Sequence, residues 1–402
     1  MRGSGLFVHT DPTDRQIDIY GGTTTLSDGE PLRVAPSAAV CSRACIGVTA
    51  KTIRRKSKMD ESREILATRL TREYGSHYPF AGAGMGFVAY ERLAAAVTQA
   101  GGIGMLGAAR EPPASLPIMV DRVRALSDGL FGVNFVCAEM PAGPSPTDAH
   151  IDQCIALAVK LVTFHHNLPP QRWVDQLHAA GARVWMQASS LALAADAVQL
   201  GVDGIVVQGR EAGGHNRSVV PLADLQRQVR NQFPDLLLLA AGGISTGHDV
   251  AAALSGGADG VWVGTRLVAS EEAYAHDEYK RRLVESGGET RVTTAFGPEW
   301  PGELYRVLAT DLVKRWAGRE AEIPTPPPGP PIMGTTRLYP HTANLEYSMP
   351  KFSALIPTPD TEGDWEEMAF PAGTGVGSIA RIQPAGEIVA EMMSEAKVQL
   401  GG

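Results

Sequence analysis

Eight short apolar segments recur between residues 79 and 264, and stretches with apolar residues at helical spacing lie between most of them. The eight segments do not alternate polar and apolar residues, which is typical of parallel strands buried on both faces. Glycine ends several of the intervening stretches, as expected at helix C-termini. The expected strands are PFAGA (79–83), GIGML (102–106), FGVNFV (131–136), LVTFH (161–165), RVWMQA (183–188), GIVVQ (204–208), LLLLAA (236–241) and GVWVG (260–264).

This alternation predicts an α/β fold. Eight successive strand–helix units fit a closed (β/α)8 TIM barrel better than an open sheet. An open, doubly wound sheet remains the alternative, because the number of strands does not prove that the barrel closes.

The overall composition restricts the partners of the chain, which has 402 residues and a formal net charge of −8. This charge argues against nucleic acid or an anionic membrane surface as a partner. No apolar run approaches the roughly 20 residues that a membrane span needs. The chain has only four cysteines, and no histidine lies near the C-x3-C pair at Cys41 and Cys45. We therefore expect no disulfide scaffold, no metal site and a cytoplasmic location.

The sequence divides into three parts. Residues 1–58 show little periodicity and no secretory signal, which predicts a poorly ordered N-terminal extension. Residues 59–270 hold the barrel. Residues 271–402 predict a helical and irregular C-terminal extension, mostly helical up to residue 318, with a Pro-rich tether at 323–331 and a closing helix in AGEIVAEMMSEAKVQL. We expect this extension to form a lid or an oligomer surface, as in a homodimer, and its residues Trp300, Tyr305 and Trp316 to lie in a core.

Glycine-rich turns follow the last three expected strands, in VVQGREAGGH, LLLLAAGGISTG and GVWVGTR. Such turns can aim several backbone N–H groups at one phosphate, and barrels commonly bind phosphate after strands seven and eight. The sequence therefore predicts a cofactor that carries phosphate. The run GAGMGF (82–87) imitates a dinucleotide fingerprint, but Phe87 occupies the position of the third glycine, which disfavours a nicotinamide-binding fold.

The order of these motifs resembles that of the nitronate monooxygenase family, formerly called 2-nitropropane dioxygenases. Members are FMN-dependent (β/α)8 barrels and share their fold with the FMN-dependent enoyl-ACP reductases. The matching segments are AGAGM (81–85), AAAVTQAGGIGMLG (94–107), FGVNF (131–135), VTFHHNLP (162–169), VVQGREAGGH (206–215), AAGGI (240–244), VWVGTRLVASEEAYAH (261–276) and PAGTGVGSI (371–379).

The resemblance implies FMN as the cofactor and assigns residues to three parts of it. The flavin ring would lie along Ala83, Gly84 and Met85, although relatives often have proline at the position of Gly84. The isoalloxazine or ribityl edge would receive hydrogen bonds from Asn134 and Gln208. The phosphate would be held by the backbone N–H groups of Gly213, Gly243, Val263, Gly264 and Thr265.

Two histidines are candidates for the catalytic base. The resemblance favours His165, which matches the proton abstractor of nitronate monooxygenases, over His215, which matches a histidine of the enoyl reductases. A neutral imidazole is suited to removing a proton alpha to a nitro group. Some relatives place a histidine on the fifth strand, where this chain has Met186. We expect His166, which points the opposite way on its strand, to be structural.

These observations predict an enzyme that uses FMN and O2 to oxidise alkyl nitronates, or nitroalkanes, to a carbonyl compound and nitrite. The expected partners are thus a small-molecule substrate and O2. One alternative is an NAD(P)H-dependent flavin reductase that acts on a quinone or an enoyl thioester. Another is a non-catalytic barrel that binds a flavin or another phosphate-bearing ligand.

Overall fold

The computed structural model describes residues 18–20, 23–25, 65–140, 143–323 and 331–401. The chain forms two compact units, Met1–Met59 and Asp60–Gly402. In the first unit, the short strands β1 (Asp18–Tyr20) and β2 (Thr23–Thr25) pair antiparallel. Apart from these strands, the predicted extension at 1–58 lies outside the described residues.

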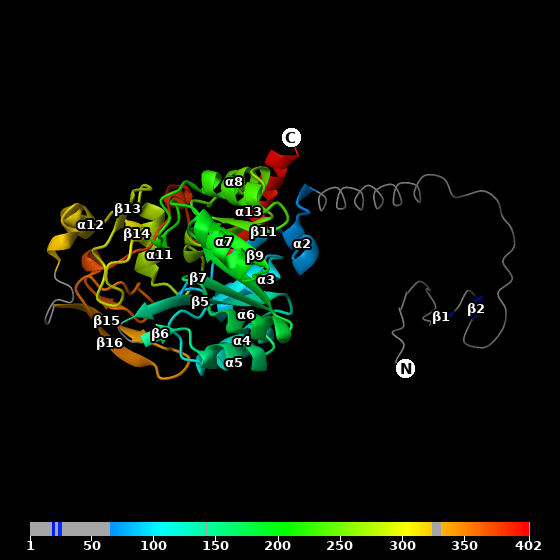
Figure 1. Cartoon of the computed structure of the whole chain (residues 1–402), viewed down its shortest axis with the longest axis horizontal. Coiled ribbons are helices and arrows are strands. Elements are labelled where there is room, and N and C mark those ends of the chain that lie inside the picture. The colour runs from blue at the N-terminus through cyan, green and yellow to red at the C-terminus, as the bar shows by residue number, and fades with distance from the viewer. Residues whose placement is uncertain (1–17, 21–22, 26–64, 141–142, 324–330, 402) are drawn as a thin grey trace, which may run out of the picture. The chain divides into compact units, whose positions relative to one another are not determined.

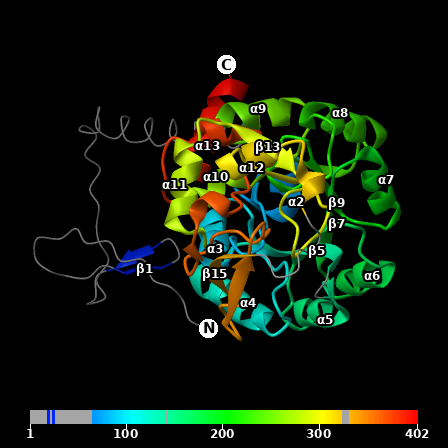
Figure 2. The same ribbon diagram turned by 90° about the vertical axis from the view of Figure 1, so that its left-hand side faces the viewer.

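The second unit contains eight parallel strands that close into a barrel, as predicted (Figures 1 and 2). Closure occurs where Ala81 pairs in parallel with Ile103. There the N–H of Gly82 donates to the carbonyl of Ile103 at 2.9 Å, so an open sheet is excluded. The strands are β3 (Phe80–Gly82), β4 (Gly104–Gly107), β5 (Phe131–Met140), β7 (Leu161–His166), β8 (Arg183–Ala188), β9 (Gly204–Gln208), β11 (Leu237–Ala241) and β12 (Gly260–Val263).

Helices cover the outside of the barrel, and Figure 2 shows most of them in an arc around the strands. The helix after the eighth strand, α10 (Thr265–Val268), has only four residues. The long helix α13 (Ala385–Leu400) packs between α9 and α3 and completes the layer. No helix among the described residues has both the length and the hydropathy needed to cross a bilayer. The other barrel helices are α3 (Glu91–Gln99), α4 (Ser115–Leu126), α5 (Asp148–Ala156), α6 (Gln171–Ala179), α7 (Leu191–Gln199), α8 (Leu222–Gln232) and α9 (Gly247–Ser255).

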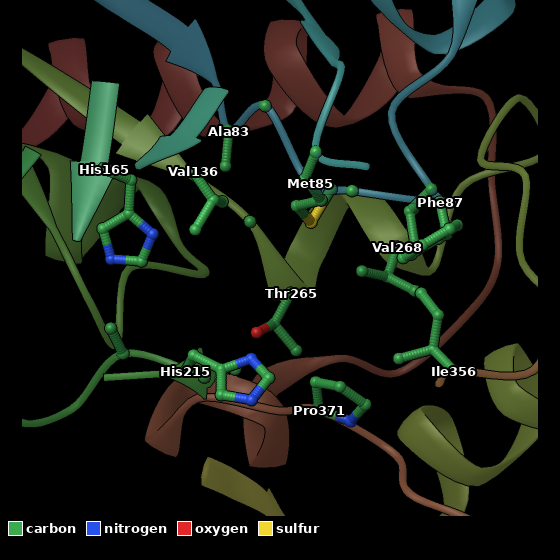
Figure 3. A pocket seen from close by; sticks show the side chains of 18 of the residues that line it. Ala83, Met85, Phe87, Val136, His165, His215, Thr265, Val268, Ile356 and Pro371 are labelled. Carbon is green, nitrogen blue, oxygen red and sulfur yellow. The ribbon is translucent and has the colours of Figure 1, made fainter. Parts of the chain in front are cut away.

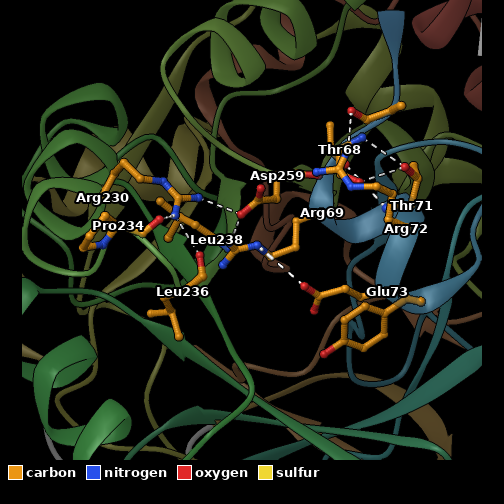
Figure 4. Close-up of polar contacts among 12 residues, drawn as sticks. Thr68, Arg69, Thr71, Arg72, Glu73, Arg230, Pro234, Leu236, Leu238 and Asp259 are labelled. Atoms are coloured by element: carbon orange, nitrogen blue, oxygen red, sulfur yellow. Dashed lines mark hydrogen bonds and ion pairs between the residues drawn. The ribbon is translucent and has the colours of Figure 1, made fainter. Parts of the chain in front are cut away.

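Large side chains fill the barrel interior and close its N-terminal end. Trp185 and Trp262 lie inside, with ring centroids 6.5 Å apart. Below them, Tyr74 at the end of α2 (Arg69–Tyr74) accepts a hydrogen bond from Trp185 Nε1 at 2.8 Å. Thr68 Oγ1 donates to the carbonyl of Asp259, whose carboxylate binds Arg230 at 2.7 Å (Figure 4). With this end filled, the open end is the carboxyl end of the strands, where barrels place their sites.

The segment after the barrel contains more β-structure than predicted. Strand β14 (Tyr305–Leu308) pairs antiparallel with β13 (Thr290–Thr293) and with the two-residue β10 (Gly214–His215) of a barrel loop. The tail expected to be irregular contains the hairpin of β15 (Ile332–Leu338) and β16 (Leu345–Pro350), which lies at the left of Figure 1. The remaining elements are β6 (Gly143–Ser145), α11 (Asp277–Glu285), α12 (Asp311–Trp316), η1 (Glu320–Glu322), β17 (Glu362–Gly363), η2 (Trp365–Glu367) and η3 (Thr374–Ser378).

The predicted closing helix matches α13, and its packing explains why it forms. The buried residues of this helix recur every three or four positions and so form one face, which includes Ile388, Met392 and Ala396. Most of the predicted Pro-rich tether, 324–330, lies outside the described residues.

The role of α13 as the last helix of the barrel layer leads to a stability prediction. Met393 is fully buried, whereas Val398 on the same helix is 69% exposed. Truncating a buried methionine costs about 2–5 kcal/mol, and a surface substitution changes stability by about 0.5 kcal/mol or less. Denaturant unfolding of the full chain should show Met393→Ala strongly destabilised and Val398→Ala nearly unchanged. Equal stability of the two variants would mean that α13 is not part of the barrel unit.

Candidate functional site

A cavity of about 470 Å³ lies at the carboxyl end of the barrel strands, as Figure 3 shows. The barrel contributes the turns after β3, β9, β11 and β12. The C-terminal segment contributes the other side, through residues 298–305, the β15–β16 hairpin and residues 354–356 and 371–375. The site is therefore formed jointly by the barrel and the segment that follows it.

All but one of the residues predicted to bind FMN or to act as the base line this cavity. The exception is Val263, which is fully buried in β12 and whose carbonyl accepts a hydrogen bond from the N–H of Ala83 at 2.8 Å. Val263 thus holds the end of β3 through a backbone hydrogen bond from the neighbouring strand β12. The residues that do line the cavity are His165, His215, Ala83, Gly84, Met85, Asn134, Gln208, Gly213, Gly243, Gly264 and Thr265.

Asn134 holds the turn after the first barrel strand. Its Nδ2 donates to the carbonyl of Gly84 at 2.8 Å, and its Oδ1 accepts from Thr163 Oγ1 at 2.6 Å. A Cβ at position 84 would overlap the Cβ of Asn134. The glycine at this position therefore lets the Asn134 side chain pack directly on the turn.

Glycines bring the C-terminal segment against the turns after β9 and β11. A Cβ on Gly213 would overlap the backbone of Gly373, and a Cβ on Gly375 would overlap the carbonyl of Gly243. The N–H of Gly373 also donates to Thr265 Oγ1 at 3.0 Å. These contacts bring the PAGTG sequence at 371–375 into the wall of the cavity.

The turn after β11 leaves backbone donors unused. Gly242 and Gly243 have φ values of +117° and +74°, which glycine adopts without strain. Within the described residues, neither N–H donates to a protein atom. At the start of α9, by contrast, the N–H groups of Ser245 and Thr246 donate to Asp249. The glycine turn, and not the helix terminus, therefore offers donors to an anion.

The two candidate bases face the cavity from different elements. His165 is the penultimate residue of β7 and lies between Val136 of β5 and Gln187 of β8. His215 comes from β10, and its ring stacks on Tyr305 with centroids 4.1 Å apart. Figure 3 shows both rings on the same side of the cavity, opposite Val268 and Ile356.

Burial keeps both imidazoles neutral. Desolvation, reinforced by His166, lowers the pKa of His165 to about 4. Desolvation and the neighbouring histidines lower the pKa of His215 to about 3. At neutral pH each ring can therefore accept a proton. His166 lies outside the cavity lining, packs on Trp300 with centroids 4.5 Å apart, and has Nε2 3.5 Å from Glu303, as suits a structural residue.

Two buried polar atoms of the cavity lack a hydrogen-bond partner among the described residues. They are Nε2 of His215 and Oε1 of Gln208. The Gln208 amide is close enough to His165 to favour its protonated form, but it is not aligned for a hydrogen bond. Buried polar groups rarely remain unpaired. A bound molecule with polar edges, such as a flavin ring and its substrate, fits these atoms and the glycine turn.

The sequence analysis did not identify several residues that line the cavity. On β8 the side chain that lines the cavity is Gln187, whereas Met186, discussed above in place of a histidine, is buried on the outer side among apolar residues. Trp300, expected in a core, lines the cavity. Successive side chains of a strand point to opposite faces, so the position of Gln187 next to Met186 could have placed it inside the barrel. No local sequence pattern places a loop residue such as Trp300.

The close glycine contacts lead to a prediction about cofactor binding. An alanine at Gly375 would force the carbonyl of Gly243 away, and overpacking of this kind costs about 1–3 kcal/mol. We expect Gly375→Ala to raise the Kd for FMN by about tenfold, measured by titrating the apoprotein and following FMN fluorescence.

The control for this measurement is Gly386→Ala on α13, where the nearest atom to a new Cβ would be 3.9 Å away. This variant should bind FMN as the unmodified protein does. If Gly375→Ala were stable and kept full affinity, the glycine turn would not hold the cofactor.

Comparison with known proteins confirms the resemblance in the sequence. The family model described as "Nitronate monooxygenase" matches residues 67–395. The chain is 29% identical over 367 residues to a nitronate monooxygenase of Paraburkholderia phytofirmans, covering 80% of this chain and 93% of that protein. It is 34% identical over 248 residues, or 62% of this chain and 67% of the relative, to the (3aS,4S,5R,7aS)-5-hydroxy-7a-methyl-1-oxo-octahydro-1H-indene-4-carboxyl-CoA dehydrogenase of Rhodococcus jostii (strain RHA1).

Solved structures agree with these sequence relatives. FabK from Thermotoga maritima superposes with a TM-score of 0.68 at 28% identity, covering 83% of this chain and 97% of that one. A nitroalkane oxidase from Streptomyces ansochromogenes superposes with a TM-score of 0.65 at 27% identity, covering 83% and 98%. The family model spans the barrel, the cavity and most of α13. The chain therefore belongs to the nitronate monooxygenase family and is a flavin-dependent oxidoreductase built on a (β/α)8 barrel.

Proposed function

We propose that this protein binds FMN and oxidises alkyl nitronates, or nitroalkanes after their deprotonation, with O2 to a carbonyl compound and nitrite. The observation that carries the proposal is a pair of neutral histidines, His165 and His215, facing one cavity beside an unused glycine turn. The family relationship supports the reaction type. When bound, the isoalloxazine ring supplies the oxidising chemistry, and the chain binds, orients and handles the proton.

The proposal of FMN as the cofactor rests on the number of unused backbone N–H donors in the glycine turn. Unused donors at Gly242 and Gly243, next to Gly264 and Thr265, suit one phosphate group. Asn134 is occupied by Gly84 and Thr163, so its proposed contact to the flavin would use its second Nδ2 hydrogen. Gln208, whose Oε1 has no hydrogen-bond partner in the described part of the chain, is the freer of the two amides.

His165 is the proposed base. Its ring lines the cavity at the carboxyl end of β7, and its lowered pKa leaves the acceptor nitrogen unprotonated at neutral pH. Taking the alpha proton of a nitroalkane would create an imidazolium beside an anionic nitronate. The two ions would lie in a cavity lined by protein, where they attract each other more strongly than in bulk water, and this attraction would offset part of the cost of charging His165.

A comparison of two substrate forms tests this assignment. A neutral nitroalkane needs a base, whereas a nitronate has already lost its alpha proton. With the FMN-loaded full chain, His165→Asn should lower kcat/KM for nitroethane by about 10²- to 10⁴-fold, because general bases contribute that much. Its kcat/KM for ethyl nitronate should change far less.

His215→Asn and His166→Asn are the matched comparisons for this test. If His215→Asn alone separated the two substrate forms, His215 would be the base. If all three variants oxidised both substrates at the rate of the unmodified protein, none of these three histidines would be the base. A protein that binds flavin yet oxidises neither substrate would favour the non-catalytic alternative.

The lowered pKa of His165 also predicts the pH dependence. A base works in its deprotonated form, so activity falls as the pH decreases through the pKa of about 4. An unshifted histidine, with a pKa of about 6.5, would lose activity at much higher pH. We expect kcat/KM for neutral nitroethane to stay constant from neutral pH to about pH 5 and to fall below that. A midpoint near 6.5 would contradict the neutral, buried base.

A second candidate reaction is the oxidation or reduction of an acyl thioester. One observation favours it: the relative from Rhodococcus jostii, named as a carboxyl-CoA dehydrogenase, is 34% identical to this chain. Anaerobic mixing separates the two candidates. Bleaching of the flavin by a nitronate supports the first, whereas bleaching by NADH or by a saturated acyl-CoA, with no response to nitronates, supports the second.

A further inference from the structure

One wall of the cavity is aromatic, and it comes from the segment after the barrel. We use the term aromatic wall for Trp300, Tyr305, Tyr339 and Tyr347, which all line the cavity. The glycine turns of the barrel face the same space. Because the glycine side is the proposed cofactor side, the aromatic wall is the surface left for the substrate.

Two of the four residues of this wall use their hydroxyl groups within the protein. Tyr347 Oη donates to Glu299 Oε1 at 3.0 Å, and Tyr305 Oη donates to the carbonyl of Ala354 at 3.2 Å. The Glu299 carboxylate also accepts from Ser353 Oγ at 2.5 Å and from the N–H of Ala354 at 2.7 Å. With its hydroxyl engaged, Tyr347 presents ring carbons to a ligand, whereas the buried Tyr305 ring stacks on His215 and supports that histidine. Glu299 fixes the roof formed by residues 354–356.

Trp300 connects the aromatic wall to the proposed chemistry. Its ring lies with its centroid 4.4 Å from that of His215 and 4.5 Å from that of His166. His215 is also held from another side by Tyr305. A ligand body packed on Trp300 would therefore lie beside Nε2 of His215, which has no hydrogen-bond partner within the described residues.

The charges of the cavity also restrict the ligand. Among the described lining residues, only Arg110 and Glu299 carry a formal charge at neutral pH, and Glu299 is engaged by the roof. The other lining side chains near the roof are apolar, including Leu338, Leu355 and Ile356. Such a surface suits an uncharged carbon body whose polar head points to His215 and Gln208.

We propose that the aromatic wall is a subsite for ring-bearing substrates, either alicyclic or aromatic, with the ring packed on Trp300 and the reacting nitro or nitronate group toward the histidines. This inference rests on the proposed function and specifies its substrate class. A flat or puckered ring loses little conformational freedom on binding and offers a large apolar face to an aromatic side chain. A short acyclic nitronate would leave Trp300 uncovered.

The test compares ring-bearing and acyclic substrates in the FMN-loaded full chain. Unmodified protein should have a higher kcat/KM for the nitronate of nitrocyclohexane than for ethyl nitronate. Trp300→Ala should lower the ratio of the two values by about tenfold or more, and Trp300→Phe should restore most of it. The acyclic substrate serves as the internal reference for any disturbance of His215.

The matched control is Trp365→Ala, because Trp365 packs on His276 and is not among the cavity-lining residues. This variant should leave the ratio unchanged. An unchanged ratio in Trp300→Ala, with nitronates still oxidised, would overturn the subsite while leaving the proposed function intact.

A binding measurement separates the subsite from the reaction. Cyclohexanone and acetone are unreactive carbonyl analogues, and their binding can be followed by the change in the visible spectrum of the bound flavin. Tighter binding of cyclohexanone that is lost in Trp300→Ala but kept in Trp365→Ala would support the subsite even if no nitronate were oxidised. Equal dependence on Trp300 for both ketones would overturn it.

Discussion

Two backbone segments approach each other so closely that only glycine fits between them, and the site depends on this contact. The turns after β9 and β11 contribute Gly213 and Gly243, and residues 371–375 contribute Gly373 and Gly375. Side chains at these points would push the C-terminal segment outward. The cavity would then lose the wall that carries Pro371 and Gly375, and α13, which follows in the chain, would be displaced from its place between α9 and α3. Cofactor binding and barrel stability are therefore coupled through the same few residues.

The electrostatics of the site follow from its enclosure. His165 and His215 are neutral because the surrounding chain removes water from them, not because an acidic partner is missing. Glu303 is paired with Arg217, lies beside His166 and is outside the cavity lining. Of the two charged side chains that do line the cavity among the described residues, Glu299 accepts hydrogen bonds from Tyr347, Ser353 and Ala354. In the proposed reaction, proton transfer within the cavity would therefore depend on two weakly basic imidazoles.

The sequence was most informative where a local pattern determines the structure. Strands β8 and β9 begin and end as predicted, because apolar runs bounded by polar residues and glycine form strands that helices cover. Strands β13 and β14 were missed, since each has only four residues. They pair with each other, and β14 also pairs with β10, far away in the chain.

Among the cavity residues, too, the sequence located those that follow a local motif and missed those that are placed by tertiary contacts. The motifs located the glycine turns and both histidines, because strand ends in a barrel converge at one face. They did not reveal that Val263 is buried behind the turn or that Trp300 reaches the site. The position of Trp300 depends on β14 pairing with β10, a tertiary contact that a local pattern does not contain.

The place of α13 in the barrel has a consequence for how the chain is made. All eight strands are synthesised before residues 385–400, yet the apolar surfaces of α9 and α3 that α13 covers are already present. We therefore expect a nascent chain to carry an incomplete barrel until synthesis has passed Leu400. The apolar surface between α9 and α3 is exposed in this incomplete barrel. Such a surface is a binding site for chaperones and a starting point for aggregation. The cavity also gains the wall formed by the PAGTG segment only after that segment is translated, so we expect flavin loading to be a late step in maturation.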